Sequence, residues 1–149
     1  MSTGCLFCEQ EGGQRLWRDA RCRVVLTDEP FVGYCRVIWD EHVREMTDLA
    51  AADRAHVMHV VYAVESALRA RLAPVKVNLA SLGNQTPHLH WHVIPRFADD
   101  THFPNPVWGS AQRDSPSRAL PDDFVASLAG DLAVMLGPAI GTMNSSAHR

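Results

Sequence analysis

The sequence predicts an α+β domain: an antiparallel sheet of five strands with one long helix packed on one face, followed by a C-terminal helix. Short alternating or β-branched apolar runs lie on both sides of a single long helical stripe, and the connections between neighbouring runs suit antiparallel pairs. A chain of 149 residues is long enough to bury the core of one domain. We place that domain at residues 1–137 and a loose C-terminal tail at residues 138–149.

Five short segments have the composition of strands. A tight Asp19-Ala20 connection separates the first two, and the third ends before Asp40. A small polar loop, residues 80–86, joins the fourth to the fifth in a predicted hairpin. The five segments are residues 16–18, 21–27, 34–39 and 75–79 and the run that begins at His88.

Two segments have helical periodicity. The long helix begins near Thr47 or Asp53 and ends near Ala73, because Pro74 disfavours helical geometry in the residue before it. The second helix covers residues 122–137 and begins with two acidic side chains at its positive end. The apolar stripes are Val57, Val61, Val64, Leu68 and Leu72 in the first helix, and Phe124, Leu128, Leu132 and Met135 in the second.

Composition limits the partners and the compartment. The formal net charge is −3, so the chain has no basic footprint for nucleic acid or an anionic membrane. No apolar run is long enough to cross a bilayer, and the N-terminus lacks a basic flank followed by an apolar stretch. We therefore expect a cytoplasmic protein in which Cys22 and Cys35 are buried small hydrophobes rather than disulfide partners.

Residues 87–96 carry the strongest functional pattern in the chain. His88, His90 and His92 alternate with large apolar residues, which places the three imidazoles on one face of a strand and the apolar residues against a core. Side chains two residues apart on a strand lie roughly 6.5–7 Å apart, so neighbouring imidazoles could act on one ligand. The pattern alone fits a metal site, or a nucleophile whose neighbours hold a substrate.

This run resembles the histidine triad (HIT) motif, in which three histidines alternate with apolar residues. His88-Leu89-His90-Trp91-His92-Val93-Ile94 matches the motif in register, and Pro95-Arg96 is a common continuation. The resemblance covers residues 5–96 and implies a HIT-like α+β fold, a nucleotide substrate and a homodimer.

The N-terminus resembles the zinc-binding branch of the same family. Two cysteines at C-x2-C spacing supply half of a tetrahedral site. In that branch the other ligands are a histidine after the third strand and the first histidine of the triad. The resemblance therefore implies a structural zinc ion held by Cys5, Cys8, His42 and His88.

The resemblance also implies the roles of the remaining site residues. His90 corresponds to the nucleophile, which attacks an α-phosphorus to give a nucleotidyl-imidazole intermediate, and His92 contacts the phosphate and helps the leaving group. Matching positions that bind substrate through the base pocket, the ribose and the phosphate are Leu6, Phe7, Leu26, Asp28, Asn78, Gln85 and Thr86. We expect cleavage of a phosphoramidate or a dinucleoside polyphosphate.

Two other functions compete with this hypothesis. A non-catalytic nucleotide-binding module would keep the same pocket, and a metalloenzyme would use the three triad histidines as ligands. The second is disfavoured because the zinc set already uses His88. The chain departs from the family in the loop at residues 83–87, which is short, and after Arg96, where Phe97, Phe103 and Trp108 lie among several prolines. Both segments border the leaving-group side, so the choice of leaving group is open.

Overall fold

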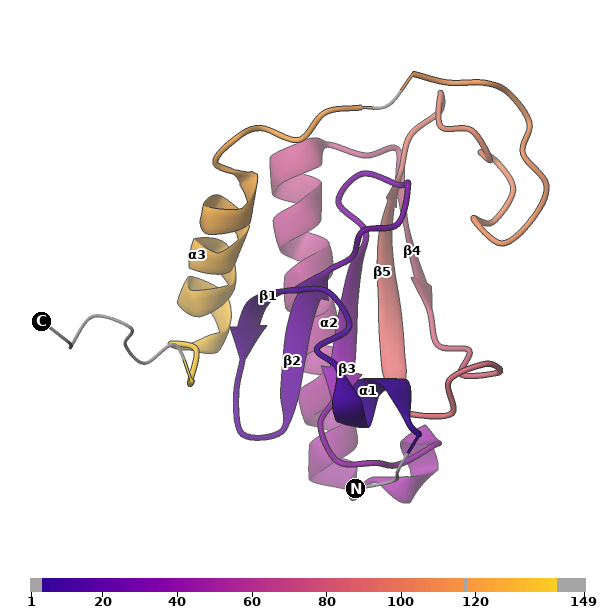
Figure 1. Cartoon of the computed structure of the whole chain (residues 1–149). Helices are drawn as coiled ribbons and strands as arrows, with labels where there is room; N and C mark the ends of the chain where they lie inside the picture. Colours follow the sequence, from indigo (N-terminus) through magenta and orange to yellow (C-terminus); the bar gives the residue numbers. More distant parts are fainter. Residues whose placement is uncertain (1–3, 117, 142–149) are drawn as a thin grey trace, which may run out of the picture.

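A computed structural model describes residues 4–116 and 118–141 of the chain. Its centre is a five-stranded sheet of order β1-β2-β3-β5-β4, in which neighbouring strands are antiparallel (Figure 1). This confirms the predicted α+β fold. The strands are β1 (Gln14–Arg18), β2 (Cys22–Leu26), β3 (Cys35–Trp39), β4 (Lys76–Ala80) and β5 (His90–Arg96).

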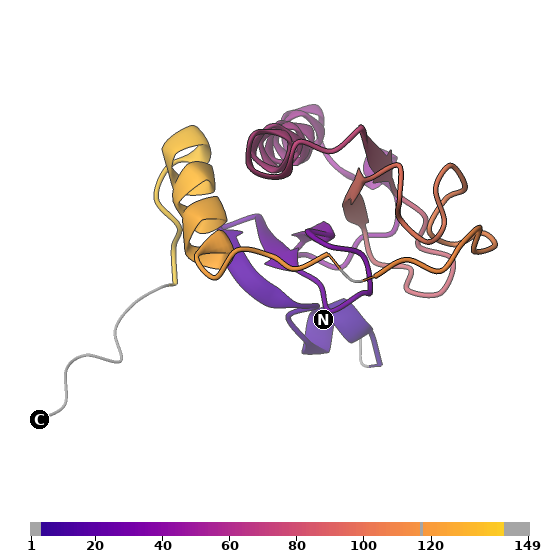
Figure 2. The same ribbon diagram turned by 90° about the horizontal axis from the view of Figure 1, so that it is seen from above.

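The helices lie on opposite sides of the sheet. The 22-residue helix α2 (Ala51–Leu72) covers one face, and the short helix α1 (Leu6–Glu9) lies on the other (Figure 2). Helix α3 (Phe124–Leu136) packs beside α2 and against β1. One face of the sheet is therefore closed by a long helix, whereas the other, among the described residues, carries only α1 and loops.

The predicted end of the long helix is correct and its beginning differs. Ala73 adopts a left-handed backbone with φ of +46° directly before Pro74, which ends α2. Thr47 instead lies in a separate 3₁₀ turn, η1 (Met46–Asp48), where the Glu45 and Asp48 side chains form a capping box. The two predicted helix starts, near Thr47 and near Asp53, therefore belong to two separate elements, η1 and α2.

The core lies between α2 and the sheet. Of the predicted stripes, Val57, Val61, Val64, Leu68, Phe124, Leu128 and Leu132 are buried. Leu72 packs partly against the core, and Met135 is 40% exposed, so the C-terminal end of the second stripe was wrong. The apolar residues of β5 that face this core include Val93, and both Cys22 and Cys35 are buried free thiols, as expected.

Strands β4 and β5 form the predicted hairpin, but β5 begins at His90 rather than His88. Leu89, directly before the strand, still bonds to β3, since its carbonyl accepts from the Trp39 N–H (3.1 Å), but its N–H donates to the Val43 carbonyl (2.8 Å), in the segment after β3. His88 is thus held at the entrance of β5, facing the segment that follows β3. The Ser81 hydroxyl donates to the His90 carbonyl (2.8 Å), which fixes one end of the intervening loop.

The irregular connection after β5 is organised by one buried arginine. Arg96 is 2% exposed, forms two hydrogen bonds to the Asp100 carboxylate (2.8 and 3.0 Å), and also donates to the Asn78 side chain and the Asn105 carbonyl. Burial of Asp100 would raise its pKa, but the hydrogen bonds from Arg96 and three backbone amides outweigh burial and lower the pKa to about 2. The connection is therefore pinned to the end of β5.

The chain returns to β1 after α3. The Trp17 indole N–H donates to the Gly137 carbonyl (2.9 Å), and the Ile140 N–H donates to the Arg18 carbonyl (2.9 Å). The predicted tail thus begins with residues that pack on β1, and residues 142–149 lie outside the described residues. None of the helices in the described ranges combines the length and apolar composition that crossing a membrane requires.

Loss of the Arg96 partner is predicted to destabilise the protein. Asp100→Ala leaves a buried guanidinium without its carboxylate, which costs about 3 kcal/mol of unfolding free energy. Asp99→Ala is the matched control: it removes an exposed pair with Arg118 and costs under about 1 kcal/mol. Urea denaturation of both variants measures the difference, and equal losses would show that Arg96 does not depend on Asp100.

Candidate active site

The sheet face opposite α2 gathers the polar side chains of the central strands. In the register of β3 and β5, Arg36 lies opposite His92 and Ile38 lies opposite His90. Side chains of directly opposed residues share a face, so these four line one surface. Both imidazoles are only 6% exposed, and each therefore needs a hydrogen-bond partner inside the protein.

His90 obtains its partner from the backbone. Its Nδ1 lies 2.6 Å from the His88 carbonyl oxygen. A carbonyl only accepts, so Nδ1 carries the proton and Nε2 keeps a free lone pair. Burial lowers the pKa of His90 and outweighs the opposing effect of this hydrogen bond, which keeps the ring neutral. The Phe7 ring packs edge-on against the imidazole, with 4.8 Å between the ring centroids. His90 thus presents a neutral, unprotonated Nε2.

His92 has the opposite arrangement. Its Nδ1 lies 2.6 Å from the hydroxyl of Tyr34, which is 3% exposed. Burial raises the pKa of Tyr34 to about 12, so the hydroxyl keeps its proton, and the imidazole nitrogen is its one hydrogen-bond acceptor among the described residues. Tyr34 therefore donates to Nδ1, which leaves the ring proton of His92 on Nε2. The two rings lie 4.9 Å apart, one with a bare Nε2 and one with an Nε2–H.

Four of the predicted substrate-binding residues line one hollow beside the triad. Leu6, Phe7, Leu26 and Asp28 border a groove of about 600 Å³. The Arg36 guanidinium forms part of the same wall, 5.8 Å from the centre of the Phe7 ring. The groove has the volume of a small-molecule site, and its lining mixes apolar side chains with several polar and charged ones.

The other three predicted contacts lie apart from this groove. Asn78 is on the triad face, opposite Ile94, but its side-chain oxygen accepts from Arg96 (2.9 Å). The Gln85 side chain is exposed, and the Thr86 carbonyl accepts from the His88 N–H (2.8 Å). No hydrogen bond within residues 4–116 and 118–141 joins the side chain of Gln85 or Thr86 to His90 or His92.

The four predicted metal ligands come together. One ligand atom of each of Cys5, Cys8, His42 and His88 lies within 4.8 Å of the others. The His88 Nδ1 is 3.3 Å from Cys5 Sγ, 3.6 Å from Cys8 Sγ and 3.3 Å from His42 Nδ1. Ligand atoms around a tetrahedral zinc ion, at bond lengths of about 2.0–2.3 Å, lie roughly 3.3–3.8 Å apart. The spacing fits a four-coordinate metal site.

The ring of His88 is oriented for ligation. Its Nε2 donates to the Trp39 carbonyl, so the proton is on Nε2 and the Nδ1 lone pair faces the two thiols. Neither His90 nor His92 belongs to a candidate metal cluster in the described parts of the chain. The cluster is thus separate from the two remaining triad histidines.

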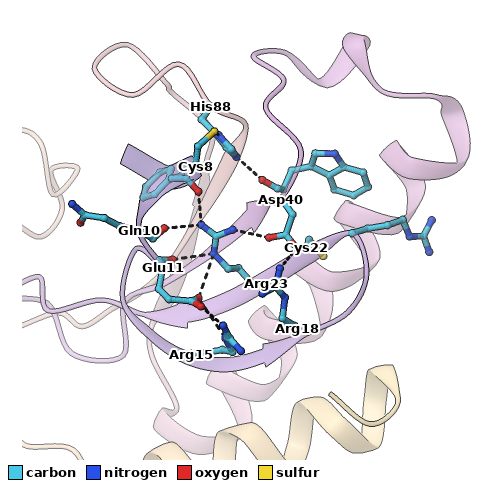
Figure 3. Close-up of polar contacts among 12 residues, drawn as sticks. Cys8, Gln10, Glu11, Arg15, Arg18, Cys22, Arg23, Asp40 and His88 are labelled. Carbon is cyan, nitrogen blue, oxygen red and sulfur yellow. Dashed lines mark hydrogen bonds and ion pairs between the residues drawn. The ribbon is translucent and has the colours of Figure 1, made fainter. Parts of the chain in front are cut away.

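A second buried arginine holds α1 against the sheet. Arg23, 6% exposed, pairs with Asp40 (2.6 Å) and donates to the carbonyls of Phe7 (2.8 Å) and Gln10 (3.0 Å) (Figure 3). Phe7 lies between the cysteines of the C-x2-C pair, so the contact positions the cluster and the groove together. Arg23, Tyr34 and Arg36 were not predicted as site residues from the sequence. The available signal for Arg23 and Arg36 was that each is a charged residue inside a segment predicted to be a strand, where it alternates with apolar neighbours.

Comparison with known proteins agrees with this geometry. A family model described as the HIT domain matches residues 9–99. The chain belongs to the HIT family. A search of curated proteins gave no match.

Solved structures of bacterial HIT proteins share the fold. A histidine triad protein from Bradyrhizobium japonicum is 26% identical, with a TM-score of 0.66, over 84% of this chain and 91% of that one. A histidine triad protein from Marinobacter aquaeolei is 25% identical, with a TM-score of 0.64, over 85% and 90% of the two chains. One from Sinorhizobium meliloti is 23% identical, with a TM-score of 0.66, over 85% and 91%, and supports the fold alone.

Protonation of His92 is predicted to couple stability to pH. Burial, reinforced by His90 and Arg36, lowers its pKa to about 3, whereas the unfolded chain takes up the proton below about pH 6.5. The contribution of neutral His92 to the free energy of unfolding is fully present above about pH 6.5 and is lost as the pH falls toward 3. Between pH 7 and pH 5 the wild type should lose about 2 kcal/mol more unfolding free energy than His92→Asn. Urea denaturation at both pH values measures this, and parallel losses in the two proteins would contradict it.

Proposed function

We propose that this HIT protein cleaves a nucleoside phosphate derivative at the α-phosphate, by hydrolysis or transfer, through a covalent nucleotidyl-His90 intermediate. The observation that carries the proposal is the hydrogen bond from His90 Nδ1 to the His88 carbonyl, which leaves Nε2 unprotonated. Neutral imidazole is a good nucleophile near neutral pH, and no separate base is needed to activate it.

In the first step, the Nε2 lone pair of His90 attacks the α-phosphorus in line with the bond to the leaving group. The P–N bond forms and the bond to the leaving group breaks. The leaving atom departs with the bonding electron pair, stabilised by a hydrogen bond from His92 Nε2–H, and takes up a proton from solvent. The new phosphoryl-imidazole still carries its proton on Nδ1 and is cationic. The His88 carbonyl at 2.6 Å stabilises that charge, because its dipole already points at Nδ1–H.

In the second step, water or another acceptor attacks the phosphorus from the side that the leaving group vacated. The proton of the water is released to solvent, and the P–N bond breaks with return of the electron pair to His90. Both imidazoles then have the protonation states with which they started. The hydrogen bond from Tyr34 to His92 Nδ1 supports both steps, since it keeps the N–H of His92 on Nε2, where it can donate a hydrogen bond to the leaving atom and to the phosphate oxygens.

The groove beside Phe7 is the proposed nucleoside pocket. Leu6 and Phe7 supply apolar contacts for a base, and the Asp28 carboxylate accepts hydrogen bonds from ribose hydroxyls. Arg36 adds one positive charge between this groove and His92, which suits a phosphate in a chain whose net charge is −3. Phosphate contacts from Asn78, Gln85 and Thr86 remain predictions, as do the cytoplasmic location and the homodimer.

The Cys5, Cys8, His42 and His88 cluster is the proposed zinc site. Two thiolates and two imidazoles form a closed tetrahedral set, which is typical of structural rather than catalytic zinc. When bound, the ion would hold the N-terminal segment on the sheet. No chemical step requires it, because the reacting atoms belong to His90 and His92.

Removal of one thiol is predicted to empty the metal site. The purified wild type should hold about one zinc ion per chain, and Cys8→Ser much less, since a hydroxyl is a poor replacement for a thiolate ligand. Cys35→Ala is the matched control, because Cys35 is a buried free cysteine outside every candidate metal cluster of the described residues and should leave the zinc content unchanged. Elemental analysis of the dialysed proteins measures the number of zinc ions bound per chain. A wild type without zinc would contradict the assignment.

Replacement of His90 is predicted to abolish turnover. Hydrolysis of adenosine phosphoramidate and of a diadenosine polyphosphate should fall on the order of 10³-fold or more in His90→Ala, because the nucleophile is lost. His59→Ala controls for the substitution itself, since His59 is exposed on α2. If the wild type binds nucleotide but turns over neither substrate, the function is that of the alternative, a non-catalytic nucleotide-binding module.

A further inference from the structure

The segment after β5 reaches the triad from outside the family domain. The HIT family model ends at residue 99, yet the indole of Trp108 packs edge-on against His92, with 5.0 Å between ring centroids and an angle of 71°. Trp108 is nonetheless 51% exposed. One part of the ring therefore rests on His92, and the rest is open to solvent beside it.

The position of Trp108 is fixed rather than incidental. It lies in a turn closed by the Gly109 N–H and the Pro106 carbonyl (2.9 Å). Asn105, just before the turn, accepts from Arg96 (2.7 Å) and donates to the Ser110 carbonyl (3.1 Å). The turn is thus tied to β5 four residues beyond His92, on the same face of the strand. A large aromatic ring held with half of its surface exposed is typical of a contact surface for a ligand.

The geometry of an in-line displacement determines which part of a substrate contacts the indole of Trp108. The attacking nitrogen and the leaving atom lie on opposite sides of the phosphorus, and the leaving atom must be within hydrogen-bond reach of His92 Nε2–H. The proposed nucleoside groove adjoins His90 through Phe7, whose ring packs on that imidazole, whereas Trp108, from the segment that follows β5, packs on His92. Whatever group departs past His92 therefore meets Trp108.

We infer that Trp108 forms a leaving-group subsite that selects substrates whose departing group carries a flat aromatic ring. The inference rests on the proposed function and deepens it. Stacking on an aromatic side chain is sensitive to the shape of the partner, so an aromatic group gains more than an aliphatic group of similar size. An aryl-bearing amine and the base of a second nucleotide both have the required surface.

Matched substrates test this subsite. The probes are adenosine 5′-phosphoramidates of benzylamine, of cyclohexylmethylamine and of ammonia, assayed with wild type, Trp108→Ala and Trp108→Phe. In Trp108→Ala, kcat/KM for the benzyl substrate should fall about ten-fold more than for the other two. Trp108→Phe should restore most of the loss, since it keeps an aromatic face. Equal losses on all three substrates would show that Trp108 merely supports His92, and no loss on the benzyl substrate would show that the ring is not contacted. Either result overturns the inference.

A binding measurement separates this inference from the proposed function. In the His90→Ala background, calorimetry compares the Kd of the benzyl and cyclohexylmethyl compounds with and without Trp108→Ala. A ten-fold weakening confined to the benzyl compound supports the subsite even if the wild type hydrolyses none of the substrates, in which case only the catalytic proposal fails. Equal Kd changes for the two compounds contradict the subsite, whatever the activity of the wild type.

Discussion

His88 is the residue on which the rest of the site depends. Its Nε2 is tied to the Trp39 carbonyl, its Nδ1 faces the two thiols of the C-x2-C segment, and its own carbonyl accepts the proton of His90 Nδ1. One residue therefore joins β3, the N-terminal segment and the nucleophile candidate. Displacement of its backbone would release His90 to adopt the other tautomer, in which Nε2 carries the proton and cannot attack.

The two faces of the sheet have different roles: one packs against the core, and the other carries the candidate active-site residues. Val93 and the buried valines of α2 fill the core on one side, and the histidines of β5 lie on the other with Arg36 and Ile38. Burying imidazoles has a cost, which is visible in the lowered pKa values of His90 and His92. Each ring offsets part of it through a hydrogen bond, His90 to a backbone carbonyl and His92 to a tyrosine. The two different partners give adjacent imidazoles complementary protonation, one free acceptor and one donor.

The sequence was sufficient where the signal is local or periodic. The alternation around His90 gave the face of the strand, Pro74 gave the end of α2, and the family resemblance gave the four members of the candidate metal cluster. It was insufficient where the contact depends on tertiary structure. Tyr34 forms a hydrogen bond with His92, and Trp108 packs against His92 from the segment after β5. No local sequence pattern predicts either contact. Met135 illustrates the same limit, because helical spacing alone does not reveal where the packed surface of α3 ends.

The most direct test of covalent catalysis is to catch the intermediate on the wild-type protein. After millisecond mixing with adenosine phosphoramidate and acid-free quenching, mass spectrometry of the peptides should find one adenylyl group, attached to His90. The adduct should form and decay at rates compatible with turnover. Turnover without any adduct, or an adduct on His92 instead, would contradict the assignment of His90 as the nucleophile.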